Sequence, residues 1–307
     1  MNENNFPGGV WPVMLTPFKN DGSVDEKALI ELVDWYIKNG ASGLFACCQS
    51  SEIFKLSFEE RVLITKITVE AAKGRVPVVA SGHTSDTIEE QAKDIDAIWN
   101  TGVDVVILLT NRLACEHESD DIWLSNLEKL VTMIKPEIRL GVYECPKPYK
   151  RLLTPKVIKS IADSGRFYFL KDTCCDQKMI EERLEIIKGS NLKLYNANAT
   201  TCLSSLRSGA AGYSGVMANF HPELYSWLCD NINNDNADYV QNILMLASLI
   251  ERQYYPTNAK YHLKEIEKLP MDTVCRVQDN SLLTTTWKTE IEMMDNLCDN
   301  VYIQYCK

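Results

Sequence analysis

The feature of this sequence that most constrains its fold is the alternation of short apolar runs with amphipathic segments over its first two thirds. Eight apolar runs predict β-strands, at residues 10–16, 44–48, 77–81, 104–110, 139–145, 167–171, 192–196 and 213–218. Amphipathic segments between them predict α-helices, at 25–39, 58–73, 88–100, 120–134, 155–163, 177–188 and 200–208. Strands that alternate with helices through short loops form parallel βαβ units. Eight such units predict an α/β protein built on a closed (β/α)₈ TIM barrel.

Capping signals indicate where some of these helices begin. A serine or threonine followed three residues later by glutamate can form a capping box, and this spacing occurs for Ser23 with Glu26, Ser57 with Glu60 and Thr87 with Glu90. After residue 218 the pattern stays helical, with no strand signal. We therefore predict a barrel over residues 1–230 and a C-terminal helical region over 231–307 packed on the barrel.

Charge and segment composition exclude several function classes. The formal net charge of −10 disfavours nucleic acid and anionic membrane as partners. The first residues, Met1-Asn2-Glu3-Asn4-Asn5, have no basic or apolar region of the secretory type. No apolar run reaches the length that spans a bilayer. We therefore expect a cytoplasmic protein.

The chain contains 11 cysteines, for which disulfide, metal-binding and apolar roles are the alternatives. Two pairs are adjacent, Cys47-Cys48 and Cys174-Cys175, and neighbouring residues on a strand point to opposite faces. Such pairs are poorly placed to ligate one metal, so we expect most cysteines to be reduced and buried as small apolar residues. The Glu116–His117–Glu118 run could ligate a metal, but in a polar loop we interpret it as solvated charge. We expect no metal.

Lys171 is the strongest functional candidate. It ends the apolar run Phe167-Tyr168-Phe169-Leu170, which is typical of a strand buried on both faces. Lysine is rarely buried unless it is paired or used, and burial lowers its pKa by disfavouring the ammonium form. A neutral amine in an apolar pocket is the nucleophile that forms a Schiff base with a carbonyl compound.

The ends of other predicted strands carry groups that suit imine chemistry. Tyr143 ends the run at 139–145, and its phenol is a candidate proton shuttle. Candidate substrate-binding residues follow the other strands, where barrel enzymes place their chemistry: Thr16, Gln49, Ser50, Ser51, His83, Asn198 and Ser214. For His83 a structural hydrogen bond is the alternative, and Glu52 is expected to bond nearby backbone or a cation.

These residues resemble the dihydrodipicolinate synthase / N-acetylneuraminate lyase family of class I aldolases, and the resemblance covers nearly the whole chain. In that family a strand 6 lysine forms a Schiff base with pyruvate or another 2-oxo acid, and Lys171 matches it. The family tyrosine opens a Tyr-Asn-x-Pro motif, matched by Tyr143-Glu144-Cys145-Pro146. The family loop Gly-[Ser/Thr]-Thr-Gly-Glu binds the keto-acid carboxylate and corresponds to Cys48-Gln49-Ser50-Ser51-Glu52. The resemblance implies a barrel with C-terminal helices, in a homotetramer or dimer.

The chain departs from the family pattern at several positions. Dihydrodipicolinate synthases follow strand 4 with Pro-Tyr-Tyr, whose second tyrosine reaches a neighbouring subunit, but this chain has Asn111-Arg112-Leu113. The family's arginine that holds the aldehyde's carboxylate is replaced by Pro148, which is flanked by Lys147, Lys150 and Arg151. Ala197 takes the place of a strand 7 glycine near the imine and is a further candidate substrate-binding residue. Dihydrodipicolinate synthase activity itself is therefore not what this sequence predicts.

The resemblance implies a carbon–carbon lyase that cleaves or forms a bond between pyruvate, or a similar 2-oxo acid, and an aldehyde. We expect a sugar-acid or hydroxy-keto-acid substrate and no cofactor beyond the imine on Lys171. Two alternatives remain: a Schiff-base dehydratase of a keto-deoxy sugar acid, and a non-catalytic metabolite-binding barrel.

Overall fold

In the computed structural model, which describes residues 6–307, eight parallel strands form one sheet in the order β1-β8-β7-β6-β5-β4-β3-β2. The strands are β1 (Gly9–Val10), β2 (Leu44–Ala46), β3 (Val78–Ser81), β4 (Val105–Leu109), β5 (Leu140–Tyr143), β6 (Phe167–Asp172), β7 (Lys193–Asn196) and β8 (Gly212–Tyr213). The sheet closes because Val13 bridges to Phe45 of β2, and the Met14 N–H donates to the Phe45 carbonyl at 3.0 Å. The predicted (β/α)₈ barrel is confirmed.

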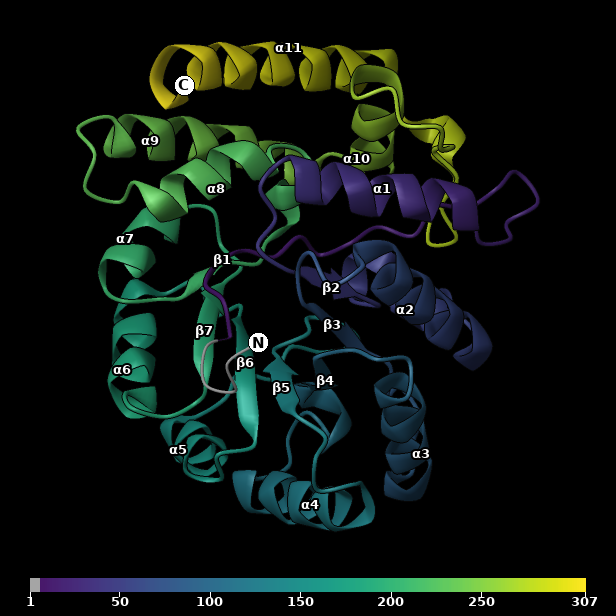
Figure 1. Ribbon diagram of the computed structural model, residues 1–307, viewed down its shortest axis with the longest axis vertical. Helices are drawn as coiled ribbons and strands as arrows, with labels where there is room; N and C mark the ends of the chain where they lie inside the picture. Colours follow the sequence, from purple (N-terminus) through teal and green to yellow (C-terminus); the bar gives the residue numbers. More distant parts are fainter. Residues whose placement is uncertain (1–5) are drawn as a thin grey trace.

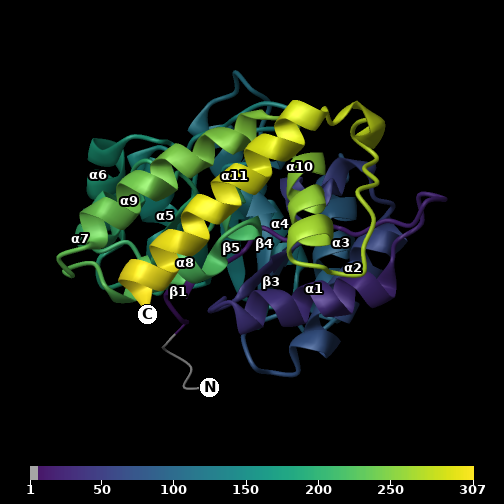
Figure 2. The ribbon, with the colours of Figure 1, turned by 90° about the horizontal axis from the view of Figure 1, so that it is seen from above.

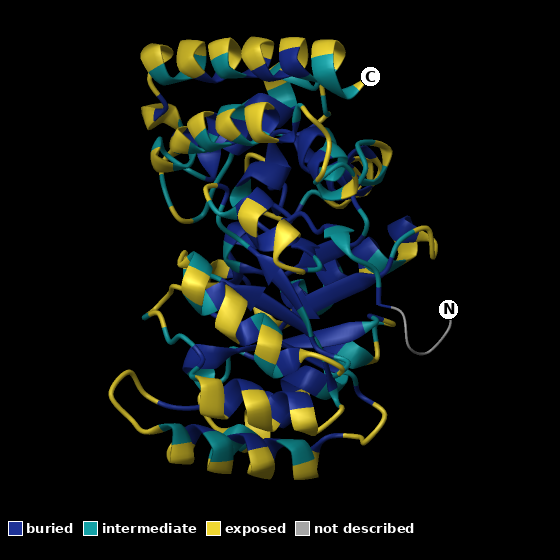
Figure 3. Cartoon of the chain, turned by 90° about the vertical axis from the view of Figure 1, so that its left-hand side faces the viewer, coloured by how far each residue is buried: buried dark blue, intermediate teal, exposed yellow. Residues whose placement is uncertain are grey.

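Helices surround the strands on the outside (Figure 1). They are α1 (Glu26–Lys38), α2 (Phe58–Ala72), α3 (Ile88–Trp99), α4 (Asp120–Met133), α5 (Pro155–Asp163), α6 (Gln177–Ile187), α7 (Cys202–Arg207) and α8 (Pro222–Asp230). In the view coloured by burial, the strands are dark blue and the outward helix faces are yellow (Figure 3). Each helix therefore buries one face against the sheet, as an amphipathic pattern requires.

Side-chain chemistry sets the starts of these helices. Ser57 and Glu60 form the predicted capping box of α2, with the Glu60 N–H 3.2 Å from Ser57 Oγ and the Ser57 N–H 2.9 Å from Glu60 Oε2. Thr87 caps α3 as expected. The prediction for Ser23 is wrong, because Asp25 caps α1 and Ser23 instead bonds the carboxylate of Asp21.

The first and last strands are shorter than predicted. Pro12 interrupts the run at 10–16, because proline has no N–H for the ladder, so β1 ends at Val10 and only the Val13 bridge continues it. In the run at 213–218, β8 ends at Tyr213 and residues Val216–Asn219 form a 3₁₀ turn. A short buried apolar run is compatible with a strand or with a helical turn, so the hydrophobic pattern alone could not show where the strand ends.

The barrel interior below the site is filled by aromatic rings. Phe169 stacks on Tyr195, with ring centroids 4.1 Å apart, and Trp11 meets Phe169 edge-on at 5.2 Å. Offset-stacked and edge-to-face pairs are the favourable geometries for such rings. The lower barrel is therefore packed core, and space for a ligand remains at the carboxyl ends of the strands.

Beyond α8 the chain forms α9 (Ala237–Ala247), α10 (Thr257–Tyr261) and α11 (Thr285–Val301). The helices α9 and α11 run side by side over one end of the molecule (Figures 1 and 2). The expectation that the described chain after β8 lacks strands is confirmed, while the division at residue 230 stays a prediction. Within residues 6–307, no helix has both the length and the apolar character that crossing a membrane requires.

Candidate active site

Lys171 and Tyr143 lie next to each other at the carboxyl ends of β6 and β5. The two residues are register partners in neighbouring strands, so their side chains point to the same face of the sheet. The Lys171 Nζ atom lies 4.4 Å from the centre of the Tyr143 ring and 5.6 Å from that of Phe45. Both Lys171 and Tyr143 are buried. The amine therefore lies beside two aromatic rings in an apolar surrounding.

Burial changes the proton equilibria of both groups. The pKa of Lys171 is lowered to about 8, because the low-polarity surrounding disfavours the ammonium form. The pKa of the Tyr143 phenol is raised well above its usual value, also mainly by burial. Near neutral pH the site can therefore hold a partly neutral amine beside a fully protonated phenol.

Lys171 and Tyr143 open into a cavity of about 550 Å³. Gln49 and Ser50, two of the predicted substrate-binding residues, line the same cavity. The Cys145 thiol donates to Gln49 Oε1 at 3.6 Å, which leaves the Gln49 amide NH₂ group available to a ligand. The remaining lining residues are Glu52, Phe54, Lys55, Pro146, Lys147, Val216, Tyr255, Pro256, Val277 and Gln278.

Two further residues predicted to bind substrate instead fix the loop at 48–52. Ser51 Oγ donates to the Met14 carbonyl at 2.5 Å and accepts the Cys48 N–H at 3.1 Å. Thr16 Oγ1 donates to the Ser51 carbonyl at 2.9 Å. Neither side chain is part of the cavity lining. Both hydroxyl groups therefore form hydrogen bonds that hold the loop that carries Ser50.

The four other predicted binding residues also lie outside the lining. Ser214 Oγ donates to the Trp11 carbonyl at 3.0 Å, and the Asn198 carboxamide oxygen accepts the Thr201 N–H at 3.0 Å. His83 Nε2 accepts the Leu109 N–H at 3.2 Å, and burial lowers the pKa of this imidazole to about 3. His83 thus makes a structural hydrogen bond, which was the alternative to substrate binding for this residue.

Ala197, the last of the four, holds the end of β7. Its N–H donates to the Asp172 carbonyl at 3.0 Å, which extends the pairing of β6 with β7 beyond their last ladder residues. The residue supports the strand that carries Lys171 and does not line the cavity.

Glu52 is held by a buried ion pair with the C-terminal region. Lys260 Nζ lies 2.7 Å from Glu52 Oε1, and both side chains are fully buried. The other carboxylate oxygen accepts the N–H groups of Arg276 at 2.6 Å and Val277 at 2.9 Å. The expectation that Glu52 pairs with a cation and with backbone is confirmed, and the pairing ties α10 to the loop under the cavity.

A second buried ionic network lies directly behind the two central residues. Glu144 follows Tyr143, Asp172 follows Lys171, and Arg183 on α6 pairs with both carboxylates. The distance from Arg183 Nη2 to Glu144 Oε1 is 2.8 Å, and all three side chains are at most 2% exposed. Since each carboxylate is adjacent in sequence to a central residue, the arginine fixes the ends of β5 and β6 relative to each other.

Sequence reasoning missed several cavity residues contributed by loops and by the C-terminal region. Tyr255 is the clearest case, because its phenol accepts the Asn219 amide at 3.1 Å at the edge of the site. The only sequence feature at this position is the dipeptide Tyr255-Pro256, which predicts a turn. A turn does not indicate which part of the molecule the tyrosine contacts. Lys55 was missed for the same reason.

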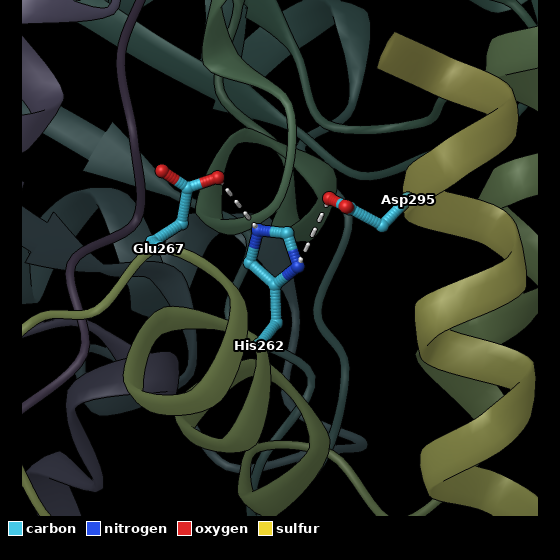
Figure 4. Close-up of side chains that lie close together, drawn as sticks. All are labelled: His262, Glu267 and Asp295. Carbon is cyan, nitrogen blue, oxygen red and sulfur yellow. Dashed lines mark ion pairs between the residues drawn. The ribbon is translucent and has the colours of Figure 1, made fainter. Parts of the chain in front are cut away.

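One cluster among the described residues has the composition of a metal site, and it lies away from the cavity. His262, Glu267 and Asp295 offer ligand atoms within 4.8 Å of one another. The carboxylates flank opposite ring nitrogens, with Glu267 3.7 Å from Nε2 and Asp295 3.5 Å from Nδ1 (Figure 4). A zinc ligand distance is about 2.0–2.2 Å, so no single ion could contact all three in this arrangement. We interpret the cluster as structural.

The other candidate metal groups are placed as follows. Glu116, His117 and Glu118 are exposed, and Glu118 Oε2 accepts the Cys115 N–H at 2.6 Å. This agrees with the interpretation of the run as solvated charge. All 11 cysteines are free, but only five of them are buried. The expectation that most are buried is therefore wrong, and Cys115 and Cys175 are exposed in loops. Loop cysteines of this kind carry no periodic pattern that would reveal their exposure.

Comparison with known proteins places the chain in one family. A sequence model of the Dihydrodipicolinate synthetase family matches residues 6–279. The 4-hydroxy-tetrahydrodipicolinate synthase of Anaplasma marginale (strain Florida) is 26% identical over 294 residues, covering 94% of this chain and 95% of that protein. The corresponding protein of Methanothrix thermoacetophila is 28% identical over 254 residues, covering 81% and 83%.

Solved structures share the fold. YagE, a prophage protein from E. coli K12 in complex with pyruvate, superposes with a TM-score of 0.85 at 20% identity, covering 95% of this chain and 98% of that one. CdNal from Clostridium difficile in complex with mannosamine gives a TM-score of 0.80 at 17% identity, covering 94% and 98%. At these identities the likeness shows the architecture.

Proposed function

This chain belongs to the dihydrodipicolinate synthetase family, and we propose on that premise that it is a class I aldolase of pyruvate or a similar 2-oxo acid. The observation that carries the proposal is the juxtaposition of a buried amine and a phenol at one cavity wall, with Lys171 Nζ 4.4 Å from the Tyr143 ring. A binding protein has no need of a buried amine with a pKa of about 8. Catalysis through an imine does need such an amine, because the neutral form is the nucleophile.

In the proposed reaction the neutral Lys171 amine adds to the keto carbon of a 4-hydroxy-2-oxo acid. Tyr143 donates its proton to the carbinolamine oxygen, which leaves as water, so that a C=N bond replaces the C=O bond. The C3–C4 bond then breaks, and its electron pair forms a C2=C3 enamine and neutralises the iminium. The Tyr143 phenolate accepts the C4 hydroxyl proton as the aldehyde leaves. Tyr143 returns this proton to C3, and hydrolysis of the imine by water releases pyruvate and the free amine.

The keto-acid carboxylate is assigned to the 48–52 loop. Ser50 is buried and lines the cavity, and its hydroxyl can donate to a carboxylate oxygen. The free amide NH₂ of Gln49 provides a second donor. Because the Ser51 hydroxyl and Glu52 are already bonded within the protein, these two side chains are the binding groups that the loop offers.

The test is turnover of a panel of 4-hydroxy-2-oxo acids, with released pyruvate measured by reduction to lactate. We expect pyruvate and an aldehyde in equal amounts, and Lys171→Ala should abolish the release. A dehydrated keto acid as the product would assign the same imine to a dehydratase instead. Turnover should survive chelation, because the iminium supplies the electron sink that a metal would otherwise provide. Loss of turnover in EDTA, restored by zinc, would contradict that expectation.

A further inference from the structure

We infer that Tyr255 is a positioning residue for keto-acid binding: its phenol donates to the Ser50 hydroxyl and so directs the Ser50 hydrogen toward the carboxylate of the bound 2-oxo acid. The inference rests on the proposed function, which assigns that carboxylate to the 48–52 loop. Tyr255 lies in the segment between the 3₁₀ turn Ser248–Arg252 and α10. It lines the same cavity as Ser50 and Lys171. The C-terminal region therefore adds a phenol to a cavity whose amine and carboxylate-binding loop belong to the barrel.

The orientation of the Asn219 side chain decides in which direction the hydrogen bonds of Tyr255 run. Asn219 Nδ2 lies 3.0 Å from the Val13 carbonyl oxygen and 3.1 Å from Tyr255 Oη. A backbone carbonyl only accepts hydrogen bonds, so the amide nitrogen is the group that faces Val13 and Tyr255. The carboxamide oxygen accepts the hydroxyl of Tyr36, which lies on α1. Asn219 and Tyr36 are fully buried, so these bonds are shielded from solvent.

The Tyr255 oxygen is thus an acceptor from Asn219, and the hydrogen of its own hydroxyl group remains to be donated. Burial raises the pKa of this phenol well above its usual value, so the hydrogen is present throughout the neutral range. A hydrogen bond with Ser50 opposes this rise in the pKa, which identifies the Ser50 hydroxyl as a polar neighbour of the phenol. Ser50 carries one hydrogen and two lone pairs. It can therefore accept from Tyr255 and still donate to a ligand.

A carboxylate ligand requires this direction of donation. An ionised carboxylate has no hydrogen, so Ser50 can bind it only by donating. If Ser50 gave its hydrogen to Tyr255 instead, the serine lone pairs would face the carboxylate and repel it. Donation from Tyr255 occupies one of those lone pairs and leaves the Ser50 hydrogen for the ligand. Because the serine hydroxyl is oriented before the keto acid arrives, less rotational freedom is lost on binding.

A buried ion pair holds the segment that carries Tyr255 against the 48–52 loop. Lys260 lies in α10, directly after that segment, and its Nζ atom is 2.7 Å from Glu52 Oε1. Glu52 follows Ser50 in the same loop, and both side chains of the ion pair are fully buried. The phenol and the serine hydroxyl are therefore carried by two backbone segments that are fixed to each other.

The inference is tested by a double-mutant cycle on the capture of pyruvate. Wild-type protein, Ser50→Ala, Tyr255→Phe and the double variant are each incubated with pyruvate over a range of concentrations until the imine reaches equilibrium. Borohydride then reduces the imine, and the half-saturating concentration is read by intact mass. Tyr254→Phe is the matched control, because Tyr254 Oη donates to the Asp279 carbonyl at 2.8 Å and the residue lies outside the cavity lining.

We expect Tyr255→Phe to raise the half-saturating concentration of pyruvate about three- to tenfold, and Tyr254→Phe to leave it unchanged. In the Ser50→Ala background, Tyr255→Phe should have no further effect, because the phenol then has no serine hydroxyl to orient. Unchanged affinity in Tyr255→Phe would overturn the inference. Additive losses would also overturn it, because a phenol that touches the substrate or only supports the fold weakens capture in both backgrounds.

Two other outcomes concern the premise and are distinguishable from these. Unchanged affinity in Ser50→Ala would overturn the assignment of the carboxylate to the 48–52 loop, and the inference with it. Failure of the wild-type protein to capture pyruvate would overturn the proposed function itself.

Discussion

At the scale of single residues, burial decides how Lys171 can react. The pKa of its amine is lowered to about 8, mainly because burial disfavours the charged form. The nucleophile is the neutral amine, which becomes abundant above the pKa, so a lowered pKa shifts reactivity toward neutral pH. We predict that the rate of imine formation with pyruvate rises with pH and has its midpoint near 8, measured by borohydride quenching at successive times. A midpoint near the ordinary lysine value of 10.5 would contradict this account.

Substitutions of Tyr143 and Ser50 are predicted to impair different properties, turnover in the first case and keto-acid affinity in the second. Tyr143→Phe removes the proton relay and little volume, so turnover should fall by roughly 10²–10⁴, while the half-saturating concentration of the keto acid, measured after trapping reaches equilibrium, is kept. Ser50→Ala removes a donor to the carboxylate, so the half-saturating concentration of pyruvate should rise about tenfold. Turnover and trapping affinity are measured for both variants. Near-normal turnover in Tyr143→Phe, or a loss of affinity there without one in Ser50→Ala, would show that the roles are misassigned.

The sequence located the strand residues of the site better than its loop residues. Lys171 and Tyr143 end apolar runs, so the hydrophobic pattern of each strand and the position at its end are enough to assign both residues to the site. Ser51 and Thr16 lie in equally suitable positions, but their hydroxyls turn to backbone carbonyls. Lys55 and Lys147 reach the cavity because of loop conformation, including the left-handed backbone at Glu52 (φ 61°). Hydrophobic patterning carries no information on such turns.

At the scale of elements, the site depends on how β5, β6 and α6 are joined. Arg183 pairs with Glu144 and Asp172 in a fully buried network. Arg183→Met would leave two buried carboxylates without their counter-charge, and we predict a loss of roughly 3–5 kcal/mol in the free energy of unfolding, measured by urea denaturation. Adding Glu144→Gln and Asp172→Asn to this variant should restore part of the loss, because those changes remove the uncompensated charges.

A surface ion pair serves as the matched control. Arg207 on α7 makes a bidentate pair with Asp238, at 2.8 and 2.9 Å, but both side chains are exposed. Arg207→Met should therefore cost less than about 1 kcal/mol. Equal losses in Arg183→Met and Arg207→Met would contradict the role given to the buried network. The sequence could not have revealed this network, since pairing across 39 residues follows from the barrel and not from local pattern.

At the scale of the whole molecule, the barrel and the C-terminal region both contribute residues to the cavity. The family's strand 4 tyrosine, which reaches a neighbouring subunit, is replaced here by a stretch that bonds within its own chain. Arg112 Nη2 donates to Thr84 O at 2.7 Å and pairs with Asp86 at 2.7 Å. The C-terminal region completes the cavity through Tyr255 and the Glu52–Lys260 pair. Assembly into a homotetramer or dimer stays a prediction from the family resemblance.

We predict that the protein captures pyruvate as a monomer. Dilution below any dissociation constant, followed by mass photometry and borohydride trapping on the same sample, measures assembly and capture together. The trapped fraction should be independent of the oligomeric state, because Lys171, Tyr143, Gln49 and Ser50 line one cavity within a single chain. Loss of capture on dissociation, with the secondary structure intact by circular dichroism, would contradict a self-sufficient site.

The central claim is that Lys171 forms an imine with a 2-oxo acid. The most direct measurement is incubation with pyruvate and borohydride, followed by proteolysis and peptide mass spectrometry. The account predicts a reduced pyruvyl group on Lys171, absent in Lys171→Ala and unchanged in Lys193→Ala, which removes the lysine at the start of the neighbouring strand β7. An unlabelled wild-type protein, or labelling that persists undiminished in Lys171→Ala, would contradict it.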